Sequence, residues 1–276
     1  GAEKTNDPAI GSFNPDGFTV TGSSNQTNAS SGSYVAWAWK AGGTAGTNTD
    51  GSQTSVVSAN TTYGFSIVTG TQNSNNTLNT FGHGLGAEPK MIILKRTNGS
   101  EDWYVYHTEL GNTSRVQLNS NAAVTTGSGV WGSTTPTSSV FTIQSFNAGD
   151  LVAYCISPVS GYSAVGSYTG NGSSDGPFIY TGFRPAFVMT KRASAAEDWS
   201  IVNTTTSPNN PAWQNLRPNE TNGEGGGIGV NDIDILSNGF KLRNSTNRFN
   251  GTGTYIYAAF AENPFGGENV SPANAR

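Results

Sequence analysis

Apolar residues recur at every second position in short runs along the chain, and segments rich in Gly, Ser, Thr and Asn separate these runs. The clearest runs cover residues 34–39, 151–156 and 255–260. In each run one face carries bulkier side chains than the other, which is typical of a strand that covers a sandwich core. The runs predict about six or seven strands per unit and no helix. We therefore expect an all-β fold of antiparallel β-sandwiches with jelly-roll or lectin-like layers.

A shorter apolar strand precedes each of these runs, at residues 18–20, 141–143 and 240–242. The connecting segments contain Asn and Gly, which turns with positive φ require. The pattern predicts a hairpin-like module in three copies. Cys155 occupies the same column as Ala38 and Ala259, so we interpret it as a small buried hydrophobe and not as a nucleophile.

The pattern of residues 89–103 recurs, without insertion, in residues 185–199. Each copy predicts an apolar strand, a basic pair, a polar turn and a second strand that opens on Trp, as expected of a duplicated structural unit. The residues shared at a separation of 96 positions are Pro89 and Pro185, Lys95 and Lys191, Arg96 and Arg192, Glu101 and Glu197, Asp102 and Asp198, and Trp103 and Trp199.

This repeat divides the chain into successive segments. We expect an N-terminal hairpin in residues 1–43, a linker or loosely paired edge in 44–61, sandwiches in 62–158 and 159–265, and a tail in 266–276. The hairpin corresponds to the tail of a further unit whose front half is missing. Because an isolated hairpin is only marginally stable in water, it should dock on the first sandwich or on a neighbouring subunit, and we favour the neighbour.

Composition narrows the possible partners. Charged residues make up 12% of the chain, the net charge is −4 and the pI is about 5.1, so the clustered basic residues that bind nucleic acid are not expected. The single cysteine excludes an internal disulfide framework. No apolar run approaches the roughly 20 residues that span a bilayer, and membrane insertion is not expected.

Candidate chemistry is sparse. The adjacent carboxylates Glu101-Asp102, with their repeat, suggest either acid/base or cation chemistry or, as we favour, a turn that pairs with the neighbouring Lys and Arg. His83 and His107 have no partners at a metal-ligand spacing, and the Gly-rich residues 223–229 lack the ending of a phosphate loop. We therefore expect no catalytic residue, no cofactor and no metal.

The aromatic residues outside the repeat are better candidates for binding. Trp131 and Trp213 have no counterpart at the 96-residue separation and lie in polar, loop-like segments. There an indole can stack on a sugar or anchor a protein partner. The alternative is a hydrophobic plug that closes one end of a sandwich. We predict that both residues contact a partner or glycan.

Several motifs extend over nearly the whole chain: Tyr34-Val-Ala-Trp-Ala-Trp-Lys-Ala-Gly42, Gly64-Phe-Ser-Ile-Val68, Gly82-His-Gly-Leu-Gly86, Trp103-Tyr-Val-Tyr-His107, Gly166-Ser-Tyr-Thr-Gly-Asn-Gly172 with Asp175-Gly-Pro-Phe178, Tyr180-Thr-Gly-Phe-Arg-Pro185, Leu236-Ser-Asn-Gly-Phe-Lys-Leu242 and Tyr255-Ile-Tyr-Ala-Ala-Phe-Ala-Glu-Asn-Pro264. In these motifs the sequence resembles the repeated β-rich domains of tail-fibre and other virion structural proteins of marine tailed bacteriophages, including cyanophages. The resemblance brings no catalytic residues with it.

The resemblance implies a non-enzymatic virion structural protein. We expect a tail-fibre or appendage component on the particle surface that presents loops for host attachment. Its partners would be other copies of itself, with a trimer by analogy to phage appendages, other virion proteins, and a host surface glycan or protein. The alternatives are a capsid decoration or cement protein and a tailspike-like glycan depolymerase.

Overall fold

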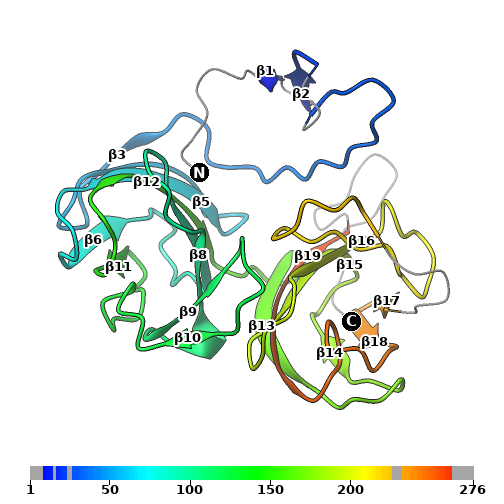
Figure 1. Ribbon diagram of the computed structural model, residues 1–276. Helices are drawn as coiled ribbons and strands as arrows, with labels where there is room; N and C mark the ends of the chain where they lie inside the picture. Colours follow the sequence, from blue (N-terminus) through cyan, green and yellow to red (C-terminus); the bar gives the residue numbers. More distant parts are fainter. Residues whose placement is uncertain (1–8, 15–16, 24–26, 226–231, 263–276) are drawn as a thin grey trace.

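The computed structural model describes residues 9–14, 17–23, 27–225 and 232–262. Two antiparallel β-sandwiches lie side by side, and a short hairpin stands apart from both of them (Figure 1). The only helix among the described residues is the 3-10 turn η1 (Thr108–Leu110). The predicted all-β class is therefore confirmed. The predicted tail at 266–276 lies outside the described residues, as does part of the Gly-rich segment 223–229.

The first sandwich places an eight-stranded sheet against a two-stranded one. The large sheet has the order β10 (Thr125–Thr126), β9 (Ser114–Gln117), β8 (Tyr104–His107), β7 (Met91–Arg96), β12 (Gly149–Ile156), β5 (Phe65–Gln72), β4 (Ser55–Asn60) and β3 (Gly46–Asn48). The small sheet pairs β11 (Val140–Ile143) with β6 (Asn79–Gly82). For residues 44–61 the sequence predicts either a linker or a loosely paired edge. Strands β3 and β4 lie in this segment, and β4 pairs with both β3 and β5, so the paired edge is correct.

The second sandwich repeats this topology with fewer strands. Its larger sheet has the order β13 (Ser163–Gly170), β19 (Gly253–Ala261), β15 (Pro185–Arg192) and β16 (Ser200–Asn203). Its smaller sheet has the order β14 (Phe178–Tyr180), β18 (Gly239–Leu242) and β17 (Ile233–Leu236). Strand β12 lies between β5 and β7 as β19 lies between β13 and β15. The duplication read from the sequence is thus a duplication of strand order.

The predicted hairpin-like module is wrong in its pairing. Strand β11 pairs with β6 and not with β12, and β18 pairs with β14 and β17 and not with β19. In the two later copies of the module, at residues 141–156 and 240–260, the two strands belong to facing sheets. Alternation predicts a half-buried strand, but it does not say whether the next strand pairs beside it or crosses to the other layer, because both arrangements bury the same face.

The sequence predicts that the bulky face of strands β12 and β19 covers the core of its own sandwich, but in the structure this face points outward. Ala153 and Cys155 lie in the core of the first sandwich, whereas Ile156 of the same strand packs against the second sandwich. Part of the large sheet is covered on both faces, and the opposite sheet fills the inner core with its own large side chains, Phe81 and Phe141. Small residues on the central strand complement these rings.

The outer faces of the two large sheets form a common apolar cluster, called here the interface cluster. Its buried members are Phe65, Met91, Val105, Val116, Ile156, Phe187, Met189, Trp199, Ile201, Ile256, Ala258 and Phe260. Burial of apolar side chains from both sandwiches in one cluster stabilises the contact between them.

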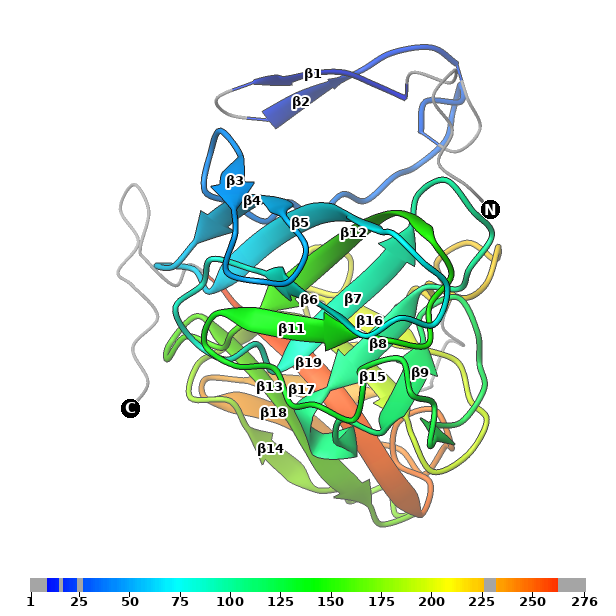
Figure 2. The same cartoon turned by 90° about the vertical axis from the view of Figure 1, so that its left-hand side faces the viewer.

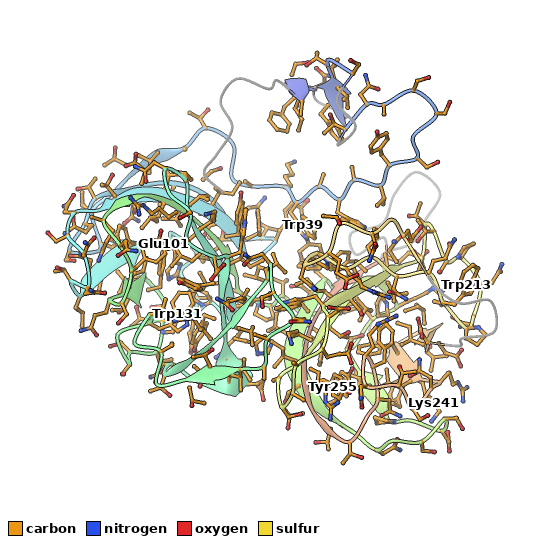
Figure 3. All side chains as sticks on the ribbon, viewed as in Figure 1. Trp39, Glu101, Trp131, Trp213, Lys241 and Tyr255 are labelled. Atoms are coloured by element: carbon orange, nitrogen blue, oxygen red, sulfur yellow. The ribbon has the colours of Figure 1, made fainter. Side chains whose placement is uncertain are left out.

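The N-terminal region differs from the predicted hairpin. Strand β1 (Ile10–Asn14) pairs with β2 (Gly17–Val20), and residues 35–41 form no strand with β2 or any other described strand. In this extended segment Trp37, Trp39 and Ala41 pack against the interface cluster. Trp39 lies where the two sandwiches meet (Figure 3), with its ring centroid 6.5 Å from that of Phe65 and 5.3 Å from that of Phe260.

Candidate functional site

The repeated motif builds a closed turn between β7 and β8. Pro89 is buried two residues before β7. Lys95, 4% exposed, donates hydrogen bonds from Nζ to the backbone oxygens of Gly99 and Glu101, at 3.1 and 2.6 Å. Arg96 Nη1 lies 3.2 Å from Glu101 Oε2. The expected pairing of the basic residues with the turn is therefore present here.

Asp102 takes a different role from the one expected. Its carboxylate accepts hydrogen bonds from Gln117 Nε2 and Asn119 Nδ2, at 2.5 and 2.9 Å, and Asn119 Oδ1 in turn accepts the backbone N–H of Trp103. In the second copy, Asp198 and Asn219 make the same two contacts around Trp199. The Asn residues are structural partners that the 96-residue comparison missed, since their separation is 100 positions.

The second copy of the turn contacts the first sandwich. Lys191, fully buried, donates from Nζ to the backbone oxygen of Asn121 at 3.2 Å and to that of Arg192 at 2.8 Å. Trp199 Nε1 donates to the backbone oxygen of Gln117 at 2.7 Å. Burial lowers the pKa of Lys191 to about 8. Pro185 opens β15, and Arg192 Nη2 donates to Thr252 O. No Lys–Glu or Arg–Glu pair closes this copy of the turn among the described residues.

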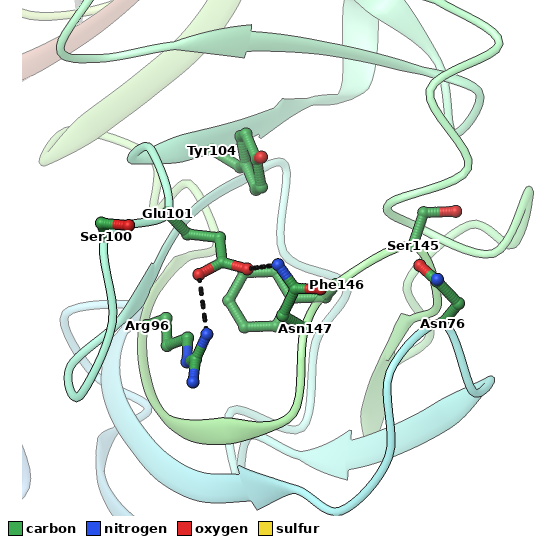
Figure 4. A pocket seen from close by; sticks show the side chains of 8 residues that line it. All are labelled: Asn76, Arg96, Ser100, Glu101, Tyr104, Ser145, Phe146 and Asn147. Carbon is green, nitrogen blue, oxygen red and sulfur yellow. Dashed lines mark hydrogen bonds and ion pairs between the residues drawn. The ribbon is translucent and has the colours of Figure 1, made fainter.

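A polar pocket of about 390 Å³ opens beside the first copy of the turn (Figure 4). It is lined by Asn76, Arg96, Ser100, Glu101, Tyr104, Ser145, Phe146 and Asn147. Glu101 accepts hydrogen bonds from Arg96 and from Asn147 Nδ2, which fixes its carboxylate. The Arg115 guanidinium lies 4.4 Å from the ring centroid of Tyr104, and burial raises the pKa of that phenol.

Most of the side chains that line the pocket are polar and uncharged. Glu101 is the only carboxylate among the lining residues, and hydrolysis by a carboxylate pair needs a second one about 5–10 Å away. Amide, hydroxyl and guanidinium groups beside an aromatic ring are the groups that recognise polar ligands such as sugars. Strand β16 carries Ser200 in place of Tyr104, one residue after the repeated Trp, so the pocket belongs to the first copy.

The two histidines and the single cysteine are buried. His83 Nδ1 accepts the backbone N–H of Leu85, and its Nε2 lies 3.2 Å from Thr137 O. His107 Nε2 lies 3.3 Å from Tyr257 O of the second sandwich, and burial lowers the pKa of His107 to about 4. Burial raises the pKa of Cys155 to about 12, which makes it an unreactive thiol. No cluster of three or more metal-ligating side chains occurs within the described part of the chain.

The two unrepeated tryptophans have different surroundings. Trp131 is 1% exposed, lies in the core of the first sandwich and packs edge-on against Tyr106 at 5.7 Å. The prediction that Trp131 contacts a partner is therefore corrected, because its ring fills the sandwich as the alternative plug would. Trp213 is 38% exposed and lies at the surface of the second sandwich (Figure 3). Its contact with a partner or glycan stays a prediction.

Fold and site together define a tandem β-sandwich protein with a polar pocket at the edge of its first unit. The chain belongs to the family of a domain of unknown function, DUF7483, whose model matches residues 1–264. No curated protein and no solved structure matches the chain. Among the described residues, no helix has both the length and the apolar character needed to cross a membrane.

Proposed function

We propose that the protein is a non-enzymatic structural component of a bacteriophage virion, carried on a tail fibre or similar appendage, where its loops contact the host surface. The observation that carries the proposal is the use of one β-sandwich twice, with the copies joined through a shared apolar cluster. Repeated rigid units that present loops at their edges are a scaffold for surface recognition. The motif resemblance to repeated virion domains supports the same role.

The chemistry of the described residues supports binding over catalysis. The lining carboxylate of the polar pocket is held by Arg96 and Asn147, and Asp102 is occupied by Gln117 and Asn119. Carboxylates engaged in this way position a turn. Other copies of the chain, other virion proteins and a host glycan or protein are the partners that this role requires.

A capsid decoration protein is the second candidate, favoured by one feature. The hairpin β1–β2 exposes Phe13 to 82% and stands apart from both sandwiches (Figure 2). Large exposed aromatic side chains mark a surface that a partner covers. On a capsid, that partner would be a neighbouring shell subunit.

Location on the particle tests the proposal. Mass spectrometry of purified virions from the source of the sequence should detect the chain, and gold-labelled antibody with cryo-electron microscopy should place it on a tail appendage. Labelling spread over the shell would favour the decoration protein. Absence of the chain from washed particles would contradict both roles.

The first prediction concerns Trp213. Trp213→Ala should reduce binding of the purified protein to host cells by roughly tenfold or more, because a partly exposed indole can act as an interface anchor. Its thermal stability should change little. Tyr180, 59% exposed on β14, supplies the matched control: Tyr180→Ala should leave binding unchanged. Equal loss in both variants, or no loss in Trp213→Ala, would remove Trp213 from the contact surface.

A further inference from the structure

The hairpin β1–β2 corresponds in register to the hairpin β17–β18. Phe13 lies opposite Phe18, and Asn14 opposite Gly17. In the same way Ile235 lies opposite Phe240, and Leu236 opposite Gly239. The burial is reversed, however. Ile235 and Phe240 are 2% and 0% exposed in the second core, whereas Phe13 and Phe18 are 82% and 38% exposed. Core positions of the repeat are thus exposed in its N-terminal copy.

Residues 35–41 correspond to the central strands β12 and β19. Trp37 and Trp39 pack against the interface cluster, as Tyr154 and Phe260 do. The opposite face, which in β12 carries the buried Cys155, here carries the exposed Ala36 and Ala38. The backbone of 35–41 also forms no hydrogen bond with a neighbouring strand among the described residues, whereas β12 and β19 are each paired along both edges.

The first sandwich is open on the side where the second one is covered. Ser167 of β13 donates a hydrogen bond to Glu109 Oε2 of the first sandwich at 3.0 Å. Thr69 is the equivalent residue of β5, because Phe65 and Ser163 hold the same position opposite Ile156 and Phe260. Thr69 is exposed and lines an open groove of about 650 Å³.

The tryptophans of the repeated turn show the same difference. The segment that follows β9 in the first sandwich, from Gln117 to Val124, lies across the second copy of the turn. There it covers Trp199, which is 1% exposed. Trp103, the equivalent residue of the first copy, is only half-buried. A further unit that contacted the first sandwich in the way that the first contacts the second would cover both Trp103 and the groove at Thr69.

We propose that the described residues between 10 and 41 are one half of a β-sandwich and form a docking site for a polypeptide that carries the other half, the front half of this same repeat. Strands equivalent to β13 and β15 pair on the two edges of residues 35–41, and their apolar side chains cover Phe13, Phe18, Ala36 and Ala38. The completed sandwich extends the interface between the first two, so its outer face continues the interface cluster. The inference stands independently of the virion role.

Two synthetic peptides test the proposal on the full chain. One covers residues 161–171 and supplies β13; the other covers 183–204 and supplies β15 with β16. Each peptide should slow amide hydrogen exchange of alternate residues within 35–41 by at least about tenfold, since each edge of a strand carries alternate N–H groups. Together they should protect the whole segment, and fluorescence anisotropy of labelled peptide reports the affinity. Scrambled peptides should neither bind nor protect.

A matched pair of variants locates the binding surface. Phe18→Asp places a charge where the repeat buries a ring and should weaken binding of the labelled 183–204 peptide roughly tenfold or more. Phe178→Asp alters a phenylalanine of similar exposure, 43%, on β14, and should bind like the parent chain. Unchanged binding by Phe18→Asp would remove the hairpin from the site and overturn the half-sandwich.

Two further outcomes would overturn the proposal. In the first, neither peptide binds or protects residues 35–41. In the second, the chain dimerises on its own, as measured by analytical ultracentrifugation, and the same amides are protected without peptide. The occupant would then be a second copy of this half and not the front half of the repeat.

Discussion

The two sandwiches carry the same signature residues in two different environments. In the second, Lys191 and Trp199 reach across to backbone oxygens of the first sandwich. In the first, Lys95 bonds the backbone of its own turn, and Trp103 is half-buried. One motif therefore closes a turn in both copies and joins sandwiches in one. The same residue can therefore contribute a different amount to the free energy of unfolding in each copy, because its surroundings differ.

The largest expected difference between the copies is at the repeated tryptophan. Trp199→Ala should lower the free energy of unfolding by about 3–5 kcal/mol, because it removes a fully buried ring and the hydrogen bond from its Nε1 to the backbone oxygen of Gln117. Trp103→Ala should cost about 1 kcal/mol, because its ring is still partly in water. Urea denaturation of both variants measures the two values. Equal losses would mean that the interface cluster contributes no more stability than the exposed turn.

The second difference is between the two histidines. His107 lies between the sandwiches, and its pKa of about 4 in the folded protein is below its usual value of 6.5. The unfolded chain therefore binds the extra proton first. The contribution of His107 to stability is complete above pH 6.5 and is lost as the pH falls toward 4, by up to about 3 kcal/mol.

His107→Gln keeps a side-chain donor and cannot titrate, so it should flatten this part of the profile. Urea midpoints measured from pH 7.5 to 4 would show the change relative to the parent chain. His83→Gln is the control within a single sandwich. Burial also lowers the pKa of His83, but that residue touches no group of the second sandwich among its described contacts. An unchanged slope in His107→Gln would contradict the assignment.

Strands and repeat could be predicted from the sequence because their signals are local. Alternation located the central strands at 151–156 and 255–260, and the shared spacing from Pro89 to Trp103 identified the duplication. Each of these patterns is set by the two-residue period of a strand. The closed turn was also predictable in part, since Lys95 and Arg96 do bond the turn they precede.

The layer to which a strand belongs was not predictable in this way. Both faces of β12 are buried, so its bulky side could not be assigned to the core or to the neighbouring sandwich. Trp131 lies in a polar stretch and yet is 1% exposed, because burial there depends on Tyr106, a residue 25 positions away. The pocket at Glu101 likewise combines Asn76 with Asn147. Contacts over such separations leave no periodic signal in the chain.

The smallest expected difference between the copies is at the repeated lysine. Lys191 is buried, and its ammonium group donates hydrogen bonds to two backbone oxygens. Burial lowers its pKa to about 8, below the usual 10.5. The unfolded chain binds more protons between these values, so stability should rise with pH from about 8 to 10.5. Lys191→Met removes this rise while keeping similar volume. Near pH 7 the substitution should change the free energy of unfolding by only about 1 kcal/mol. The loss of two hydrogen bonds destabilises the variant, but the variant no longer has the cost of burying an ammonium group.

Lys95→Met provides the comparison, because Lys95 makes its bonds within its own turn. The difference in urea midpoint between variant and parent, measured at pH 7 and pH 10, cancels the titration of tyrosines common to both proteins. That difference should grow between the two pH values more for Lys191→Met than for Lys95→Met. A larger change for Lys95→Met would show that the ammonium group costs more to bury in the first copy of the turn than in the second. Contact with the first sandwich would then not explain the difference between the two copies.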